Sequence, residues 1–290
     1  MGSAVQSVTG GQSLPGDPGS PRRRDPAGVV DSPAAMLLVI DVGNTNTVLG
    51  LYEGAALRHH FRVESARGRT SDEYVALLRT LLDLRGVAAR DVTASALACV
   101  VPALAETFTR TVRDAFGHEA LVVGPGIKTG MPILSEQPRE VGADRIVNAV
   151  AAYERVHAGL IVVDFGTATT FDVVSPRGEY LGGVIAPGVQ IAADALFSRA
   201  AKLPRVEIAM PPRTLGRNTL HAMQSGIVLG YVGLVDGLVE RLRAEVGFPV
   251  KVIATGGLAR LIAPESRVIE VVDDFLTLDG LRLLWERNAT

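Results

Sequence analysis

The chain has 290 residues, of which 29 are Lys or Arg and 31 are Asp or Glu, so its formal charge is −2. This balance argues against a nucleic-acid-binding protein, which would show a basic excess or a basic stripe. Cys99 is the single cysteine, which excludes an intramolecular disulfide and disfavours a cysteine-based zinc site. No run approaches the roughly 18 consecutive apolar residues of a membrane span. We therefore expect a cytoplasmic protein that binds neither nucleic acid nor a membrane.

Residues 1–35 differ in composition from the rest of the chain. They are rich in Gly, Pro and Ser, contain no aromatic residue and carry a short basic run at Arg22–Arg24. Such a segment cannot bury enough apolar surface to offset its ordering entropy, so it is predicted to be a disordered extension. The folded part is expected to begin at Met36 and to form two domains, over residues 36–157 and 158–290.

From Met36 onward, short apolar runs typical of strands alternate with longer segments of helical periodicity. The pair Thr70 and Glu73 has capping-box spacing and predicts a helix that continues to Leu82. The expected strands are, in chain order, 37–40, 47–52, 57–63, 94–101, 121–123, 160–163, 169–174, 180–184 and 251–254. The further expected helices are 103–116, 141–156, 186–200, 219–246 and 275–288. This alternation predicts an α/β protein with mixed sheets.

An internal repeat is the most informative pattern in the chain. One apolar strand ends in Asp41 and is followed by Val-Gly-Asn-Thr. About 120 residues later, a second apolar strand ends in Asp164 and is followed by Phe-Gly-Thr-Ala. A further strand follows each copy at once, so each unit is predicted to be a β-hairpin that opens with Asp-x-Gly. The repeat therefore favours two similar domains that face each other.

The Asp-x-Gly hairpins have the chemistry of a phosphate site. Gly43 permits a tight turn, and the bare backbone N–H groups of residues 43–46 can approach phosphate oxygens closely. The side chains that add donors are Asn44, Thr45 and Thr47. Asp41 places an anion beside this anion site, which makes sense if a cation such as Mg²⁺ lies between them. One copy alone is equally well explained as an ordinary hairpin turn, but the second copy at Asp164 favours phosphate binding.

Two other glycine-rich segments discriminate less well. Gly256-Gly257 follows a strand and precedes a helix, so it can bring a helix N-terminus to a nucleotide, although many strand-to-helix turns carry glycine. The segment Gly124–Gly130 lacks the G-x-G-x-x-G spacing of a dinucleotide-binding turn. No G-x-x-x-x-G-K-[ST] sequence is present, which excludes a Walker-type phosphate loop.

Two phosphate hairpins and a Gly-Gly turn resemble the actin, sugar-kinase and heat-shock ATPase superfamily. Six motifs in order, from Met36 to about Asn288, closely resemble type III pantothenate kinases. They are Asp41–Asn46, Gly124–Gly130, Pro138–Arg145, Asp164–Thr170, Gly182–Gly188 and Gly216–Thr219. The resemblance implies an α/β fold of two similar actin-like (ribonuclease H-like) domains, with mixed sheets and an ATP cleft between them. It also implies a homodimer, in which the segment that carries Thr219 reaches the partner's site.

The resemblance implies an enzyme that uses ATP to phosphorylate pantothenate to 4′-phosphopantothenate, the first step of coenzyme A biosynthesis. Asp144 would be the general base. Asp164 would hold a monovalent cation, K⁺ or NH₄⁺, and Asp41 would hold Mg²⁺ through the phosphates. The residues implied to bind ATP are Asp41, Val42, Gly43, Asn44, Thr45, Asn46, Thr47, Val48 and Thr167. The residues implied to bind pantothenate are Gly142, Ala143, Asp144, Arg145 and Thr219, with Arg145 suited to a carboxylate.

Several of these residues have a second interpretation. An Asp at a helix start, such as Asp144, is often only an N-cap or a dipole partner. Asp172 follows the second hairpin and is interpreted as structural. The glycines of the helix 219–246 are spaced for close helix contact, either at a dimer interface or inside one chain. They are Gly226, Gly230, Gly233 and Gly237.

Two other functions remain open from the sequence. A sugar or acetate kinase can share the fold, although such chains are usually longer and lack Gly-Ala-Asp-Arg followed by Gly-Arg-Asn-Thr. A nucleotide-binding regulator without catalytic activity is the other, and the retention of Asp41, Asp144, Arg145 and Asp164 argues against it. The chain departs from the family at Ser135, in a stretch where a Tyr is common, which puts the affinity for substrate in doubt.

Overall fold

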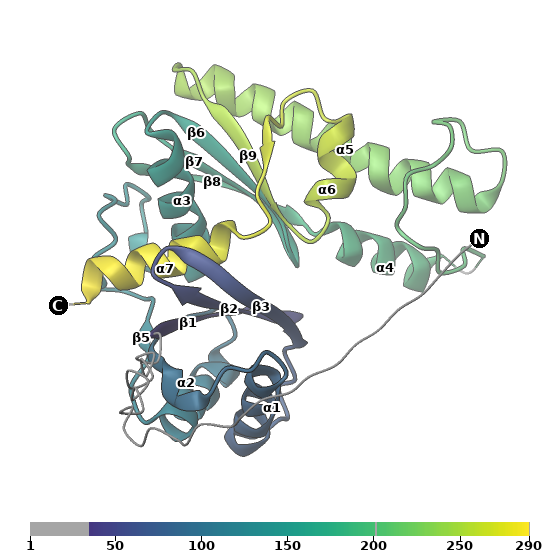
Figure 1. The fold of residues 1–290 in the computed structure, drawn as a ribbon. Coiled ribbons are helices and arrows are strands. Elements are labelled where there is room, and N and C mark those ends of the chain that lie inside the picture. Colours follow the sequence, from purple (N-terminus) through teal and green to yellow (C-terminus); the bar gives the residue numbers. More distant parts are fainter. Residues whose placement is uncertain (1–34, 201, 290) are drawn as a thin grey trace, which may run out of the picture. The chain divides into compact units, whose positions relative to one another are not determined.

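Two five-stranded mixed sheets organise the computed structural model, which describes residues 35–200 and 202–289 (Figure 1). The expected extension over residues 1–35 lies, apart from Ala35, outside these described residues. The first sheet has the order β3-β2-β1-β4-β5. Its strands are β1 (Met36–Val42), β2 (Asn46–Glu53), β3 (Ala56–Glu64), β4 (Val92–Cys99) and β5 (Leu121–Val122).

The second sheet repeats the topology of the first, with the order β10-β9-β6-β7-β8. Its strands are β6 (Leu160–Phe165), β7 (Ala168–Val174), β8 (Tyr180–Pro187), β9 (Lys251–Gly256) and β10 (Val271–Val272). In each sheet the opening strand pairs antiparallel with the next strand and parallel with the fourth. The internal repeat predicted from the sequence is therefore confirmed, and the α/β fold class with it.

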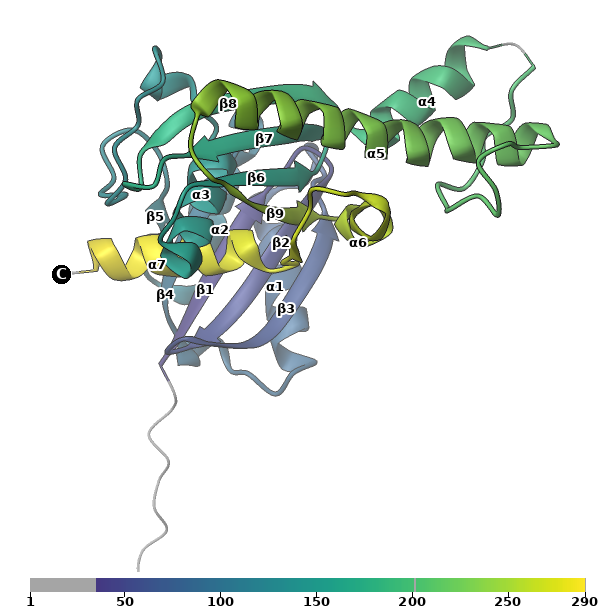
Figure 2. The same cartoon turned by 90° about the horizontal axis from the view of Figure 1, so that it is seen from above.

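The helices form layers on both faces of the sheets (Figure 2). They are α1 (Ser71–Asp83), α2 (Pro102–Phe116), α3 (Ala143–Val156), α4 (Val189–Arg199), α5 (Thr219–Val246), α6 (Ala259–Ile262) and α7 (Leu276–Asn288), with single 3₁₀ turns η1 (Ala89–Asp91), η2 (Pro138–Glu140) and η3 (Ala263–Glu265). Alternation along β1 explains two of the layers, because successive strand residues point to opposite faces. Leu38 and Ile40 pack with α1 and α2, whereas Leu37 and Val39 pack with α3 and α7.

The last helix, α7, returns from the second half of the chain to the first sheet. It packs on β1, β2 and β4 and lies against α3 (Figure 1). The hydroxyl of Tyr52 in β2 donates a hydrogen bond of 2.6 Å to Asp279 in α7. Each sheet is built from one half of the chain, but this helix joins the halves, and the domain boundary expected after residue 157 stays a prediction.

The structure corrects one expectation about secondary structure. The helix expected over 186–200 begins only at Val189, because Ala186 and Pro187 pair with β7 as the end of the edge strand β8. Sheet pairing overrides the helix propensity of alanine there, and an edge strand tolerates proline. The helix α5 is long and apolar enough to cross a membrane, with a mean hydropathy of 1.4 over 18 residues, although its apolar residues are not consecutive. Half of this stretch is buried in the fold, so packing within the chain accounts for part of its apolar character.

Candidate active site

The two Asp-x-Gly turns lie next to each other. The first turn, Gly43–Asn46, joins β1 to β2 and is closed by a 3.1 Å hydrogen bond from Gly43 N to Asn46 O. The second turn, Gly166–Ala168, joins β6 to β7 and is closed in the same way at 3.1 Å. Their side chains meet where Thr45 Oγ1 lies 3.2 Å from Thr167 Oγ1. The repeat thus brings two segments together that are far apart in the sequence.

The residues of the first turn differ in what they can offer a ligand. Asn44 and Thr45 are exposed, and Asn44 Oδ1 accepts a 3.2 Å hydrogen bond from Arg67 Nη2. Thr47 is fully buried, and its hydroxyl lies 2.9 Å from Ser65 Oγ. Side-chain donors for an anion therefore come from the turn itself. Val42 is also buried, so Val42 and Thr47 have only their backbone groups to contribute.

Three carboxylates gather beside these turns. Asp41 is the last but one residue of β1, Asp164 is the last but one residue of β6, and Asp144 lies in the first turn of α3. Burial raises the pKa of Asp41 to about 8, with further contributions from the negative charges of Asp144 and Asp164; the nearby charge of Arg62 opposes this shift. The pKa of Asp164 is raised to about 7, first by burial and then by Asp144 and Asp172.

Asp144 is not the N-cap of α3. That position is occupied by Gly142, and the Asp144 carboxylate instead accepts a 2.8 Å hydrogen bond from the N–H of Arg145. Burial raises the pKa of Asp144, whereas this hydrogen bond acts in the opposite direction. The carboxylate therefore satisfies one N–H of the helix start and remains part of the acidic cluster.

The donor set of the cluster suits a hard divalent cation, which prefers oxygen ligands. Like charges that raise one another's pKa are stabilised when a cation lies among them. Within residues 35–200 and 202–289, however, no three His, Cys, Asp or Glu side chains lie close enough to hold an ion by themselves. The residues therefore fit a divalent cation that would take one or two of its oxygen ligands from these carboxylates.

Four side chains that sequence reasoning did not assign to the site are connected to it. Asn148 donates a 3.0 Å hydrogen bond to Asp164 Oδ2 and accepts one of 2.7 Å from Thr277. The sequence could have indicated Asn148, because it lies four residues after Asp144 and therefore on the same face of the helix. Arg62 shares a row across the sheet with Asp41 through Val48, which becomes visible only once the strand register is known. The fourth side chain, after Asn148, Thr277 and Arg62, is Tyr180, whose hydroxyl donates a hydrogen bond to Asp172.

Asp172, interpreted from the sequence as structural, is fully buried and pairs with Arg145. The Nε of Arg145 donates a 2.7 Å hydrogen bond to Asp172 Oδ1. Arg145 is itself mostly buried, with 14% of its side chain exposed. The arginine that follows Asp144 is thus tied to the second sheet.

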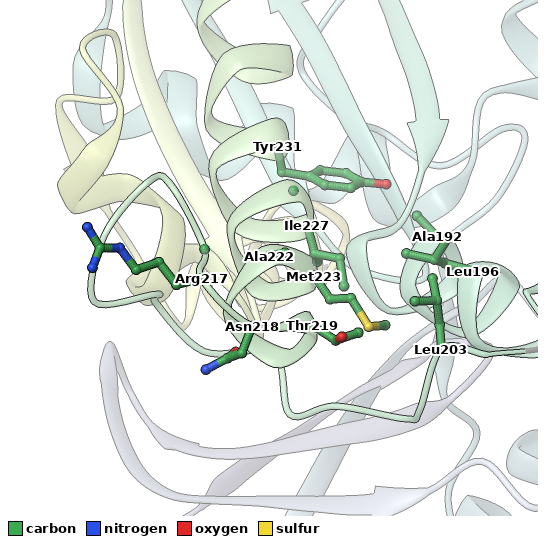
Figure 3. A pocket seen from close by; sticks show the side chains of 12 residues that line it. Ala192, Leu196, Leu203, Arg217, Asn218, Thr219, Ala222, Met223, Ile227 and Tyr231 are labelled. Carbon is green, nitrogen blue, oxygen red and sulfur yellow. The ribbon is translucent and has the colours of Figure 1, made fainter.

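Thr219 lies in a different place, at the first position of α5. It lines a cavity of about 810 Å³ between α4 and the N-terminal half of α5. Figure 3 shows Met223, Ile227 and Tyr231 of α5 facing Ala192 and Leu196 of α4 across it. None of the three carboxylates lines this cavity. Within one chain, Thr219 and the three carboxylates therefore do not line the same cavity.

The motif Gly124–Gly130 is held by the C-terminal helix. The N–H of Lys128 donates a 3.0 Å hydrogen bond to the side chain of Asn288, and Asn288 Nδ2 donates back to Lys128 O at 2.9 Å. Lys128 and Asn288 thus satisfy each other's hydrogen-bonding groups, and this pair of hydrogen bonds fixes the end of α7 to the segment.

Comparison with known proteins gives one consistent family. Residues 37–241 match the family model of type III pantothenate kinases. The chain is 61% identical over 253 residues to the type III pantothenate kinase of Myxococcus xanthus. This alignment covers 87% of this chain and 99% of the relative. It is 56% identical over 254 residues to that of Moorella thermoacetica, with 88% and 100% covered.

Solved structures show the same fold at low identity. A conserved putative Baf family transcriptional activator from Campylobacter jejuni superposes with a TM-score of 0.56 at 18% identity, over 87% of this chain and 98% of that one. A putative 2-dehydro-3-deoxygalactonokinase from Sinorhizobium meliloti gives a TM-score of 0.53 at 14% identity, over 86% and 95%. At these identities the likeness concerns the fold alone.

Proposed function

Because the chain belongs to the type III pantothenate kinase family, we propose that it transfers the γ-phosphoryl group of ATP to the primary hydroxyl of pantothenate, the first step of coenzyme A biosynthesis. The observation that supports this most directly is the gathering of Asp41, Asp144 and Asp164 beside two touching glycine turns. Phosphoryl transfer depends mainly on positioning and on neutralising phosphate charge, and these elements supply both.

In this proposal the two turns hold the triphosphate. Backbone N–H groups and exposed side chains of residues 41–48, together with Thr167, bind its oxygens. The side-chain contacts come from Asn44, Thr45 and Thr167, because these are exposed at the place where the turns meet. Kinases of this family use ATP with a divalent metal, which would neutralise phosphate charge when bound. Asp41 is the residue proposed to hold this Mg²⁺ through the phosphates.

Asp144 is proposed as the general base for the pantothenate hydroxyl. Burial raises its pKa, and a base works best when its pKa lies closer to the working pH. Residues 142–145 would line the pantothenate site, with Arg145 supplying the positive charge for the substrate carboxylate. The hydroxyl proton passes to Asp144 as the γ-phosphoryl group is transferred.

Asp164 is proposed to bind K⁺ or NH₄⁺. Burial and the charges of Asp144 and Asp172 raise the pKa of Asp164, and the hydrogen bond from Asn148 brings no positive charge, so a cation beside Asp164 would stabilise its ionised form. Rates measured with K⁺, NH₄⁺ and Na⁺ at constant ionic strength test this. A rate in Na⁺ alone equal to that in K⁺ would remove the monovalent cation from the proposal.

A homodimer is proposed around α5. Gly226, Gly230 and Gly233 face open space, and exposed Leu215 and Leu220 lie near the start of the same helix. Small residues on an exposed apolar face allow a second helix to approach closely, so a partner can complete the cavity that Thr219 lines. Sedimentation of the wild type and of Gly230→Glu tests this. A monomeric wild type would overturn the homodimer.

The whole function is tested by measuring ADP from the purified full chain with pantothenate and with a panel of sugars and short acids. ADP is best quantified by chromatography, so that no coupling enzyme contributes its own cation requirement. ADP formation with pantothenate and with no other acceptor supports the proposal. ADP formation only with a sugar or with acetate supports the rival kinases. ATP binding without any turnover would favour a regulator. The proposed cellular location is the cytoplasm, and the proposal includes neither a nucleic-acid partner nor a membrane.

A further inference from the structure

The guanidinium of Arg145 is held in the fold rather than left to the solvent. Its Nε donates a 2.7 Å hydrogen bond to Asp172 Oδ1, and its Nη2 also lies 2.7 Å from that oxygen. The Nη2 atom is buried without a hydrogen bond of good geometry within the described part of the chain. One edge of the guanidinium is therefore committed to Asp172, and Nη1 is the nitrogen left for other contacts.

Asp172 is itself fixed from several directions. Its side chain is fully buried, the Tyr180 hydroxyl donates a 2.8 Å hydrogen bond to Oδ1, and Thr170 Oγ1 lies 3.3 Å from Oδ2. These partners come from β7 and β8, so the carboxylate is part of the rigid second sheet. Charged partners within hydrogen-bond range make the strongest such contacts, and their geometry is well defined.

The neighbouring strand leaves a space that the guanidinium occupies. Gly183 of β8 is opposite Asp172 in the register, and a Cβ atom there would lie 2.8 Å from Arg145 Nη2 and 1.8 Å from Phe171 O. Any side chain at position 183 would therefore push against both the arginine and the β7 backbone. Three elements, α3, β7 and β8, thus determine where the charge of Arg145 lies.

We propose that Asp172 is a positioning residue, which holds Arg145 on the second sheet and thereby sets where Arg145 can bind the carboxylate of the substrate. This rests on the proposed function, in which Arg145 binds pantothenate. A buried ion pair is not in itself a gain in stability, because desolvation offsets much of the attraction. The orientation of Arg145 gives the pair a use that stability alone does not.

The test is a double-mutant cycle with Asp172→Asn, Arg145→Lys and the double variant, each assayed for the KM of both substrates. If Asp172 acts through Arg145, Asp172→Asn raises the pantothenate KM by about 10- to 100-fold, the scale of losing a hydrogen bond to a charged group. The ATP KM stays within about twofold, since the phosphates bind at the turns. In the Arg145→Lys background, Asp172→Asn then adds little, because coupled residues are non-additive.

Asp236→Asn is the matched control. Asp236 is also a buried carboxylate paired with an arginine, Arg267 at 3.2 Å, but it lies in the C-terminal half of α5. It is expected to lower the melting temperature without a selective change in the pantothenate KM. If Asp172→Asn does not fold, Tyr180→Phe replaces it, because this change removes one hydrogen bond to Asp172 and keeps the ion pair.

The outcomes separate the two proposals. A wild type that does not phosphorylate pantothenate overturns the proposed function, and the cycle is then run with the acceptor that the panel identifies. A folded Asp172→Asn protein with an unchanged acceptor KM overturns the positioning role. Fully additive effects in the double variant, or equal increases in the KM values of ATP and acceptor, overturn it as well, since both indicate general structural damage.

Discussion

The two sheets have the same strand order, yet the carboxylates at corresponding positions have different surroundings. Asp41 and Asp164 both lie near the end of the central opening strand, each beside a glycine turn. The first turn closes from Gly43 to Asn46 and the second from Gly166 to Ala168, so the second is shorter by one residue. The repeat thus fixes the positions of both carboxylates without making the two sites equal.

The partners of the two carboxylates show the specialisation. The nearby charge of Arg62 lowers the pKa of Asp41 slightly, whereas Asp164 accepts a hydrogen bond from a neutral amide, Asn148. Burial raises both pKa values, to about 8 and about 7 respectively. A duplicated backbone can therefore present two anions to one ligand, and unrelated side chains from neighbouring elements then adjust each anion separately.

Asp144 belongs to neither of the two repeated units, and its replacement is expected to have the largest effect. It tests whether the base is a carboxylate other than Asp41 and Asp164. Asp144→Asn keeps the shape and can still accept the Arg145 N–H, but it removes the basic oxygen. The kcat is expected to fall by roughly 10²- to 10⁴-fold, the usual range for a general base. The lower end fits a loose phosphoryl-transfer transition state. Binding of a non-hydrolysable ATP analogue is expected to persist, because the turns hold the phosphates.

Asp114→Asn, at an exposed carboxylate of α2, serves as the control for that variant. It is expected to leave kcat within about twofold, as surface substitutions generally do. A folded Asp144→Asn protein with a normal kcat would exclude Asp144 as the base, and Asp41 and Asp164 would become the carboxylates to examine.

The second test compares corresponding positions on the fourth strand of each topology. Gly256 pairs with Phe165 at the end of β9, and Cys99 pairs with Val42 at the end of β4. Gly256 has a φ of +91°, and a Cβ there would lie 2.5 Å from Asp164 Oδ1. Gly256→Ala is expected to cost roughly 3 kcal/mol from strain and displacement of Asp164. The melting temperature would then fall by about 6–12 °C.

Cys99→Ala is the matched change in the first sheet. It removes a weak hydrogen bond of 3.2 Å from the thiol to Val101 O and creates no clash, so a loss of about 1 kcal/mol is expected. Thermal melts of both variants measure the difference. Equal losses would show that the close approach to Asp164 does not distinguish the two sheets.

The third test uses pH. Both carboxyl groups have folded pKa values above the value of about 3.9 in an unfolded chain. Between about pH 4 and pH 8 the folded protein therefore holds protons that the unfolded chain has released. Stability without nucleotide is expected to fall from about pH 4 upward, by up to about 1.4 kcal/mol per pH unit for each group. The contribution of Asp164 to this slope ends near pH 7 and that of Asp41 near pH 8. Asp164→Asn should therefore make the slope shallower below pH 7, and Asp41→Asn should also remove the slope between pH 7 and pH 8.

Melting temperatures between pH 5 and pH 9, without divalent cations, measure this slope. A wild type whose stability is constant over that range would contradict the raised pKa values. Saturation with Mg²⁺ and ATP is expected to reduce the slope, because added cations favour the ionised carboxylates.

The sequence revealed the part of the site that depends on local pattern. Asp-x-Gly after an apolar run is a local signal, and its repetition predicted both sheets and the meeting of two turns. The bounds of α5 also followed from the sequence, because the segment is long and ends at Gly247, a residue suited to a helix C-terminus.

The rest of the site depends on contacts between distant elements. Arg62 comes opposite Asp41 through the register of three strands, and Asp172 meets Arg145 only after α3 has packed on the second sheet. Neither residue type is unusual at its position in the sequence, so no local pattern marks it. The strand predicted over 180–184 is shorter than the observed edge strand β8 for the same reason, since the last residue pairs of β8 depend on β7.

The smallest expected effect concerns the contact between the two turns. Thr45 Oγ1 and Thr167 Oγ1 are 3.2 Å apart and exposed, and an exposed hydrogen bond of this kind contributes about 1 kcal/mol or less. Thr167→Val is therefore expected to change the melting temperature by less than about 3 °C. It should raise the KM for ATP by about three- to tenfold, because the same hydroxyl is proposed to bind a phosphate oxygen. Thr167→Ser, which keeps the hydroxyl, should restore the KM for ATP. If Thr167→Val instead lowered the melting temperature strongly and left the KM for ATP unchanged, the hydroxyl pair would serve to hold the turns together rather than to bind nucleotide.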